Sequence, residues 1–249
     1  MKGSDICPVC HGDEWVLIKH SDGTEEAVPC ECRQKSIIKR RLSFADIPEA
    51  FKDHELKSFR IDVYKSQESK AVVSVACKTI KTYLDNFVTF QDQGMGLYIY
   101  SNTKGSGKTR IAASIANELV NKRDKMVKFA VSTTILNEIK RTWDRDSEYT
   151  ENRLLDHLTT TDVLVIDDFG TEKVTGWVTD KFYHIINQRY INRKVTIFTS
   201  NESLETLKYD SRIISRIKER TYQIRFPEES VRDHIAEANN KDMLDKICG

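Results

Sequence analysis

The chain has 249 residues, of which 39% are hydrophobic and 31% charged, and its formal net charge is +1. This length allows one sizeable domain plus a small module, and the charge balance excludes a globally basic surface for nucleic acid. No apolar run approaches the roughly 20 residues of a membrane-spanning helix. Met1–Cys10 also lacks an apolar signal core. We therefore expect a cytoplasmic protein without membrane contact.

Four of the six cysteines lie near the N-terminus, at Cys7, Cys10, Cys30 and Cys32. Two short pairs with 19 residues between them are typical of a tetrahedral zinc site, and a reducing cytosol favours metal binding over disulfides. Between the pairs, two short strand-like runs flank Ser21-Asp22-Gly23, which predicts a β-hairpin with an Asp-Gly turn. Residues 1–35 are thus predicted to form a zinc module that needs its metal to fold. Three alternatives stay open: His11 replacing one cysteine, two disulfides, or unliganded thiols.

Residues 36–66 are expected to form a helical and irregular linker. Arg33–Leu42, which overlaps the start of this linker, is a candidate for a short basic amphipathic helix. It is either a solvated linker helix or a docking surface for a partner. Ile47-Pro48 breaks this helix, and Ala50–Tyr64 shows no clear period.

Residues 67–249 alternate between helical and strand-like patterns. The predicted strands are Gly96–Tyr100, Met126–Val131, Asp162–Asp167, Val195–Ser200 and Tyr222–Phe226. The main predicted helices are Ser69–Asn86, Lys108–Lys122, Thr133–Trp143, Thr179–Asn192 and Asp210–Arg220. Short apolar strands that alternate with helices indicate an α/β fold with a five-stranded parallel sheet and helices on both faces. Ligand sites in such sheets lie beyond the C-terminal ends of the strands.

The first predicted strand runs into a glycine-rich turn that ends in Gly107-Lys108-Thr109, and a helix follows at once. Backbone N–H groups of such a turn converge on phosphate oxygens. Lys108 would reach the β- and γ-phosphates of a nucleoside triphosphate, and the Thr109 hydroxyl would ligate Mg²⁺. Asn102 stands where the pattern usually has glycine, and because Asn tolerates positive φ we expect the turn to survive. The predicted nucleotide-binding segment comprises Asn102, Thr103, Lys104, Gly105, Ser106, Gly107, Lys108, Thr109 and Arg110.

A second apolar strand, within Thr161–Gly170, ends in two carboxylates. Asp167 at the strand end is placed to hold the magnesium through water, and Asp168 to orient or deprotonate the attacking water. The alternative is an acidic pair that merely opens a turn.

Two further features follow along the chain. Asn201 closes the fourth strand, where its side chain would hold the attacking water; the alternative is a cap for a helix starting near Ser203. Arg212, Arg216 and Arg220 recur every four residues and share one helix face. That face is either solvated or offers an arginine finger to a neighbouring subunit's nucleotide, which the residues alone do not decide.

The motifs NTKGSGKT, VLVIDDFG, TIFTSN and SRIISRIKER occur in this order. Together they resemble the AAA+ ATPases of the DnaC/DnaI helicase-loader group, and the related helper ATPases of insertion-sequence transposition, over roughly residues 67–235. The resemblance implies the following roles: Walker A for Lys108 and Thr109, Walker B for Asp167 and Asp168, sensor 1 for Asn201, trans-acting finger for Arg216 and sensor 2 for Arg232.

The resemblance also implies a function. It indicates an ATP-dependent loader that brings a hexameric replicative helicase onto single-stranded DNA, with ATP and Mg²⁺ in the ATPase domain and Zn²⁺ in the N-terminal module. The loader would be a homo-oligomer on its partner, with a monomeric free form left open. Because Asp168 replaces the glutamate common in AAA+ proteins, slow and partner-stimulated hydrolysis is expected. A cysteine module before the ATPase is similar to DnaI-type and phage loaders, and transposition helpers generally lack it. The alternatives are a transposition helper that binds double-stranded DNA and a non-catalytic adaptor with ATP as a structural ligand.

Overall fold

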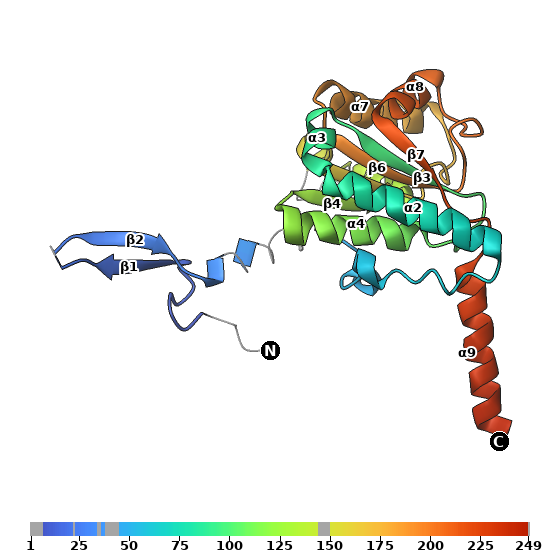
Figure 1. Cartoon of the computed structure of the whole chain (residues 1–249). Coiled ribbons are helices and arrows are strands. Elements are labelled where there is room, and N and C mark those ends of the chain that lie inside the picture. The colour runs from blue at the N-terminus through green and yellow to red at the C-terminus, as the bar shows by residue number, and fades with distance from the viewer. Residues whose placement is uncertain (1–6, 22, 34–35, 38–44, 144–149, 249) are drawn as a thin grey trace.

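The computed structural model of the chain describes residues 7–21, 23–33, 36–37, 45–143 and 150–248. Its N-terminal part is an antiparallel hairpin of β1 (Trp15–Lys19) and β2 (Glu25–Pro29), which stands apart from the rest of the chain in Figure 1. Gly23 in the connection takes a φ of 86°, whereas Asp22 of the predicted turn lies outside the described residues. Most of the predicted helix Arg33–Leu42 lies outside them too.

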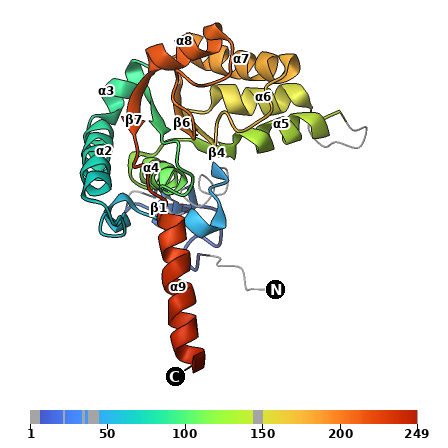
Figure 2. The same ribbon diagram turned by 90° about the vertical axis from the view of Figure 1, so that its right-hand side faces the viewer.

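The predicted sheet is confirmed, with five parallel strands in the order β4-β5-β6-β3-β7 (Figures 1 and 2). The strands are β3 (Gly96–Tyr100), β4 (Val127–Val131), β5 (Val163–Asp167), β6 (Val195–Ser200) and β7 (Thr221–Arg225). Each bound lies within one residue of its predicted position. The order places β6 between β3, which leads into the glycine-rich turn, and β5, which ends in the acidic pair.

Helices cover both faces of the sheet, as predicted. They are α2 (Gln67–Asp85), α3 (Phe87–Asp92), α4 (Lys108–Arg123), α5 (Ser132–Arg141), α6 (Glu151–Thr160), α7 (Gly176–Ile191), α8 (Ser211–Arg220) and α9 (Val231–Cys248). Side chains alternate along the strands, so that Val163 and Val165 pack toward α2 and α4, while Leu164 and Ile166 pack toward α5 to α8. Figure 2 shows the two helical layers, with α9 pointing away from the body. Across the ranges the structure describes, no helix is long and apolar enough to cross a bilayer.

The second half of the expected linker packs against the sheet domain. It contains two short 3-10 helices, Glu49–Phe51 and Leu56–Ser58. The side-chain amide of Asn117 on α4 donates to the carbonyl oxygens of Phe51 and His54, at 2.9 and 3.0 Å. Tyr64 is fully buried in the core on this side of the sheet. Residues 45–64 therefore form a strap over α4.

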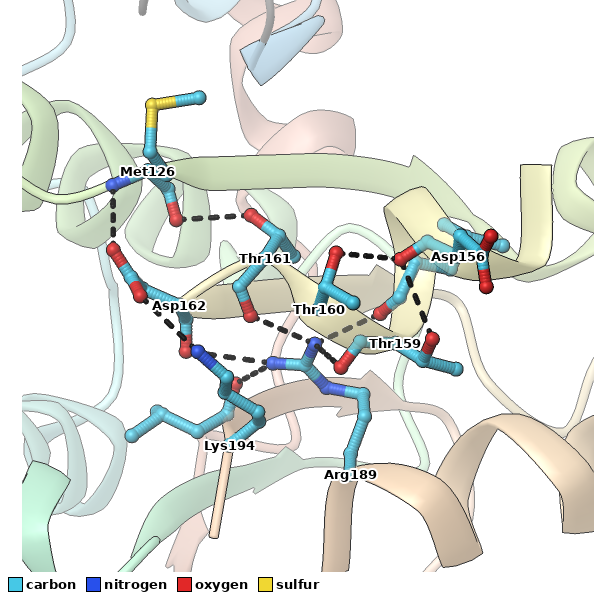
Figure 3. Close-up of polar contacts among 10 residues, drawn as sticks. Met126, Asp156, Thr159, Thr160, Thr161, Asp162, Arg189 and Lys194 are labelled. Carbon is cyan, nitrogen blue, oxygen red and sulfur yellow. Dashed lines mark hydrogen bonds and ion pairs between the residues drawn. The ribbon is translucent and has the colours of Figure 1, made fainter. Parts of the chain in front are cut away.

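At the N-terminal edge of the sheet, Arg189 on α7 is buried with 1% of its surface exposed (Figure 3). Its guanidinium donates to the carbonyl oxygens of Leu158, Thr161 and Val195 and to Oγ1 of Thr196. Burial lowers the pKa of the guanidinium. One side chain thus ties the end of α6 and the starts of β5 and β6 together, far from the glycine-rich turn.

Candidate nucleotide site and cysteine centre

The turn between β3 and α4 depends on two glycines. Gly105 and Gly107 take φ values of 76° and 100°, in the region that favours glycine. A Cβ on Gly105 would lie 2.8 Å from Oγ of Ser230, and one on Gly107 would lie 2.9 Å from the hydroxyl of Tyr64. The backbone therefore enters α4 in a tight loop whose N–H groups and helix N-terminus form a cradle for phosphate.

The start of the loop is held in a way that the sequence does not reveal. The turn is formed with Asn102 in this position, and Asn102 does not need the positive φ that asparagine tolerates. Instead its N–H donates to the carboxyl group of Glu228 at 3.2 Å. The hydroxyl of Thr103 donates to the same carboxyl at 3.0 Å, and Oγ of Ser101 lies 3.2 Å from it. Glu228 therefore fixes the segment where the usual pattern has glycine.

Lys108 begins α4, and its side chain turns back into the loop. Its Nζ donates to the carbonyl oxygens of Ser101 (3.2 Å) and Thr103 (2.9 Å) and to Oγ of Ser106 (3.2 Å). Burial lowers the pKa of Lys108, and the nearby carboxyl groups, Asp168 first, oppose that shift. The ammonium group is thus positioned at the centre of the loop, facing oxygen acceptors.

Asp167 ends β5 with 3% of its surface exposed. It accepts a hydrogen bond of 2.6 Å from Oγ1 of Thr199, and the Thr109 side chain lies within hydrogen-bonding reach. Burial raises the pKa of Asp167 to about 6, although these hydroxyls and Lys108 act in the opposite direction. The structure thus brings together Lys108, Thr109 and Asp167. A hydroxyl next to a carboxylate is the donor set that Mg²⁺ takes in such sites.

Asp168 takes a φ of 54°, an uncommon conformation for a non-glycine residue. Its N–H donates to Oγ1 of Thr199 at 2.9 Å, and its carbonyl accepts from the hydroxyl of Thr171 at 2.8 Å. Oγ of Ser132 lies 3.0 Å from the same carbonyl oxygen. Asp168 therefore does open a turn, and contacts with β6 and α5 fix the geometry of that turn. Thr199, which contacts both carboxylate residues, lies within the motif TIFTSN, but the sequence indicates a role only for Asn201 at its end.

Asn201 follows β6 directly and is half-buried. It therefore lies at the strand end between the Lys108 loop and Asp167. The alternative role, capping a helix near Ser203, is wrong, because residues 201–210 form only turns and bends before α8 begins at Ser211. The cap of α8 is Asp210, whose side chain accepts from the N–H of Arg212 at 2.8 Å.

The three arginines of α8 share one face, as predicted, and that face packs on tyrosines of α7. The guanidinium groups of Arg212 and Arg216 lie 4.9 and 5.0 Å from the ring centre of Tyr183, and that of Arg220 lies 4.9 Å from Tyr190. Arg216 is half-buried. The wholly solvated face considered from the sequence is therefore not formed.

Arg232 lies at the start of α9, directly on the loop. Its N–H and that of Val231 point to the carbonyl oxygen of Gly105, at 3.4 and 3.0 Å. Just before them, Glu229 accepts from the backbone N–H groups of Lys65 and Ser66, at the start of α2. Burial opposes ionisation of this carboxyl, but those N–H groups lower the pKa of Glu229 to about 2. The first turn of α9 is thus attached to both the loop and α2.

The predicted cysteine centre is assembled in the hairpin module. The sulfur atoms of Cys7, Cys10, Cys30 and Cys32 all lie within 4.8 Å of one another, and Cys10 and Cys30 are buried. Tetrahedral Zn–S bonds of about 2.3 Å place sulfurs about 3.8 Å apart. The Cys7–Cys30 and Cys10–Cys32 sulfurs are 3.8 and 3.3 Å apart, so the donor set fits a metal ion. The structure holds all four as free thiols and not as two disulfides, and the cluster of four does not include His11.

Comparisons with known proteins show which proteins this chain resembles. A family model described as IstB-like ATP binding protein matches residues 33–214. The phage-like element PBSX protein XkdC of Bacillus subtilis is 26% identical over 86% of this chain and 78% of its own. The replicative helicase loader DnaC of Escherichia coli is 28% identical over 57% of each chain. The replicative helicase loader DnaI of Bacillus subtilis is 34% identical over 47% of this chain and 36% of its own.

Solved structures of the same group share the fold. The crystal structure of the DnaC helicase loader has a TM-score of 0.59 at 23% identity and covers 72% of this chain and all of that one. The crystal structure of DnaI has a TM-score of 0.56 at 25% identity, covering 78% of this chain and all of that one. These likenesses confirm the AAA+ fold of the DnaC/DnaI type that the motifs resemble. The chain belongs to the family of IstB-like ATP-binding proteins.

Proposed function

We propose that this chain is an ATP-dependent loader of a hexameric replicative DNA helicase onto single-stranded DNA. The observation that carries the proposal is the meeting of Lys108, Thr109 and Asp167 at one edge of the sheet. It occurs in a chain whose relatives include proteins named replicative helicase loader. The work would take place in the cytoplasm, where the chromosome is replicated.

The loop fits a triphosphate for a physical reason. The Lys108 ammonium group now faces neutral carbonyl and hydroxyl oxygens. Phosphate oxygens in their place would make charge-assisted hydrogen bonds, which are roughly twice as strong. Backbone N–H groups of residues 105–109 would hold the phosphates, and Thr109 with Asp167 would hold the Mg²⁺. Bound ATP would supply the phosphoanhydride bond whose hydrolysis releases the loader.

Four further side chains have proposed roles in hydrolysis. Asp168 would orient or deprotonate the attacking water, and Asn201 would hold that water from the end of β6. Arg232, on the first turn of α9, would contact the γ-phosphate. Arg216 would act on the nucleotide of a neighbouring copy, so full activity needs assembly. The shorter Asp168 side chain would keep the free protein slow.

The hairpin module would grip the helicase, with Zn²⁺ held by the four thiols. Its presence before the ATPase domain favours a loader over a transposition helper. Trp15 and Leu17 point from one face of β1 and are 45% and 66% exposed, so they offer apolar surface for such a contact.

The direct test is a loading assay with purified helicase from the same cell and circular single-stranded DNA. We expect ATP and this chain to increase helicase bound to the circle, and Lys108→Ala to abolish the increase. Lys78→Ala, which replaces an exposed lysine of α2 outside this loop, is the matched control and should load normally. Loading by Lys108→Ala at the wild-type level would refute ATP dependence.

The same preparations separate the alternatives. Binding to double-stranded DNA together with a transposase, and none to the helicase, would identify a transposition helper. Intact helicase binding with no ATP turnover, unchanged by Asp168→Ala, would identify a non-catalytic adaptor.

A further inference from the structure

A buried carboxyl group with no assigned role lies five residues beyond Asp167. Glu172 is 8% exposed. Its two oxygens accept from Oγ of Ser132 (2.6 Å), from the N–H of Gly170 (3.1 Å) and from the hydroxyl of Tyr209. These three contacts occupy most of the acceptor positions of the carboxyl group. The three donors belong to three segments: the start of α5, the turn after β5, and the loop before α8.

The turn after β5 and the loop before α8 are in close van der Waals contact. The rings of Phe169 and Tyr209 are stacked, with centres 4.8 Å apart and planes 4° apart. A Cβ on Gly170 would lie 2.5 Å from Cδ1 of Leu207, so the two segments touch there as well. A shift of the turn is therefore transmitted to the loop instead of being absorbed between them.

Both ends of this contact are attached to elements of the proposed mechanism. At one end, Oγ of Ser132, which contacts Glu172, also lies 3.0 Å from the carbonyl oxygen of Asp168. At the other end, Tyr209 immediately precedes Asp210, the cap of α8, which also accepts from Nε of Arg212 at 2.9 Å. A continuous series of contacts thus leads from the acidic pair through Glu172 to α8, the helix that carries the arginines.

We infer that Glu172 and Tyr209 are positioning residues, through which the occupied nucleotide site determines where α8 and its Arg216 are held. The inference rests on the proposed function, because it requires nucleotide at Asp167 and Asp168. A purely structural filler is a poorer explanation, since apolar side chains of similar volume stabilise a buried site as well as a polar cluster does. A hydrogen-bonded cluster does something they do not: it ties three segments in one fixed geometry.

The test follows hydrogen exchange of the α8 amides with and without a non-hydrolysable ATP analogue and Mg²⁺. In the wild type we expect the analogue to slow exchange over Asp210–Arg216 by about fivefold or more, the lower range of allosteric coupling. In Tyr209→Phe, which keeps the stacked ring, and in Glu172→Gln, that slowing should be lost. Affinity for the analogue should stay within about twofold of wild type, because neither side chain touches the loop that holds the phosphates.

Tyr98→Phe is the matched control. It also deletes one buried hydroxyl, which donates to the carbonyl oxygen of Glu202 in the same β6–α8 connection at 2.8 Å, away from Glu172. It should respond to the analogue as the wild type does. Undiminished slowing in Tyr209→Phe or Glu172→Gln, or equal loss in Tyr98→Phe, would overturn the inference. Absence of analogue binding by the wild type would instead refute the proposed function, and this inference with it. Should Tyr209→Phe fail to fold, Glu172→Gln decides alone.

Discussion

The cysteine hairpin and the sheet domain differ in what stabilises their folded structures. β1 and β2 leave Trp15, Leu17 and Ile18 substantially exposed, and the buried side chains of the hairpin include two cysteines of the sulfur cluster. The sheet domain instead buries two apolar clusters, one on each face of five strands. We therefore expect the hairpin, which is too short for a core, to depend on a bound ion, whereas the larger domain is stabilised by packing. The two regions should therefore lose structure independently.

The largest expected effect concerns the hairpin. Cys10→Ser removes one of four sulfurs, and structural zinc contributes about 10–16 kcal/mol in small modules of this kind. We expect the purified variant to lose its metal by native mass spectrometry, and its hairpin amides to exchange freely. Nucleotide binding by the sheet domain should not change. His11→Ala is the control and should keep the metal; equal metal content in Cys10→Ser would contradict the four-sulfur site.

The next largest effect is a loss of ATP turnover in the sheet domain, and it is seen only when a second copy of the protein is present. Arg216→Ala should leave ATP binding intact and reduce the turnover of the assembled complex by about 10³-fold or more, the range of a finger arginine. Mixing this variant with Lys108→Ala should restore part of the rate, because each supplies what the other lacks. Arg216 now donates to Asn187 at 2.8 Å, so it must leave α7 to act. Normal turnover of the assembled variant would exclude the role.

Arg189→Ala tests how the sheet domain is held at its other edge. The substitution leaves several buried carbonyl oxygens without a donor, and each unsatisfied group costs about 1–3 kcal/mol. We expect the free energy of unfolding to fall by about 3–5 kcal/mol in denaturant titration, with the metal content of the hairpin unchanged. Arg193→Ala, an exposed neighbour, should change stability by less than about 0.5 kcal/mol. A similar small loss for Arg189→Ala would show that packing alone holds this edge.

The smallest effect depends on pH. The pKa of Glu229 is lowered from 4.5 to about 2 in the folded protein. Its contribution to the free energy of unfolding is therefore fully present above pH 4.5, and it is lost as the pH falls toward 2. Glu229→Gln should lower the free energy of unfolding by about 1–2 kcal/mol at pH 7, after a discount for solvent screening. The difference from wild type should shrink between pH 4.5 and 2. Glu237→Gln, whose exposed carboxyl pairs with Lys65 at 3.0 Å, should show no such trend.

The strands and the core of the site could be predicted because their signals are local. Each strand is a short apolar run, and the glycine-rich turn and acidic pair follow strand ends that a parallel sheet brings to one edge. The sequence therefore predicts that Lys108, Thr109 and Asp167 lie together, as they do in the structure. The cysteine spacing likewise predicted the cluster of four sulfurs in the hairpin.

What could not be predicted depends on contacts between distant parts of the chain. Tyr64 donates to the carbonyl oxygen of Ser106, and Glu228 holds the start of the same loop, across 42 and more than 100 residues. Neither residue belongs to a periodic pattern, since the strap before α2 has no regular period and Glu228 lies in a connection. Thr199 looks like any polar residue in a strand until β5 is placed beside it.

The most direct test of the account is the affinity for MgATP, measured by titration calorimetry on the full chain. We predict binding by the wild type and by Lys78→Ala, and a loss of about 100-fold or more in Lys108→Ala, since the buried ammonium group is the principal charge facing the phosphates. Equal affinity of all three proteins would contradict a triphosphate held between Lys108 and Asp167.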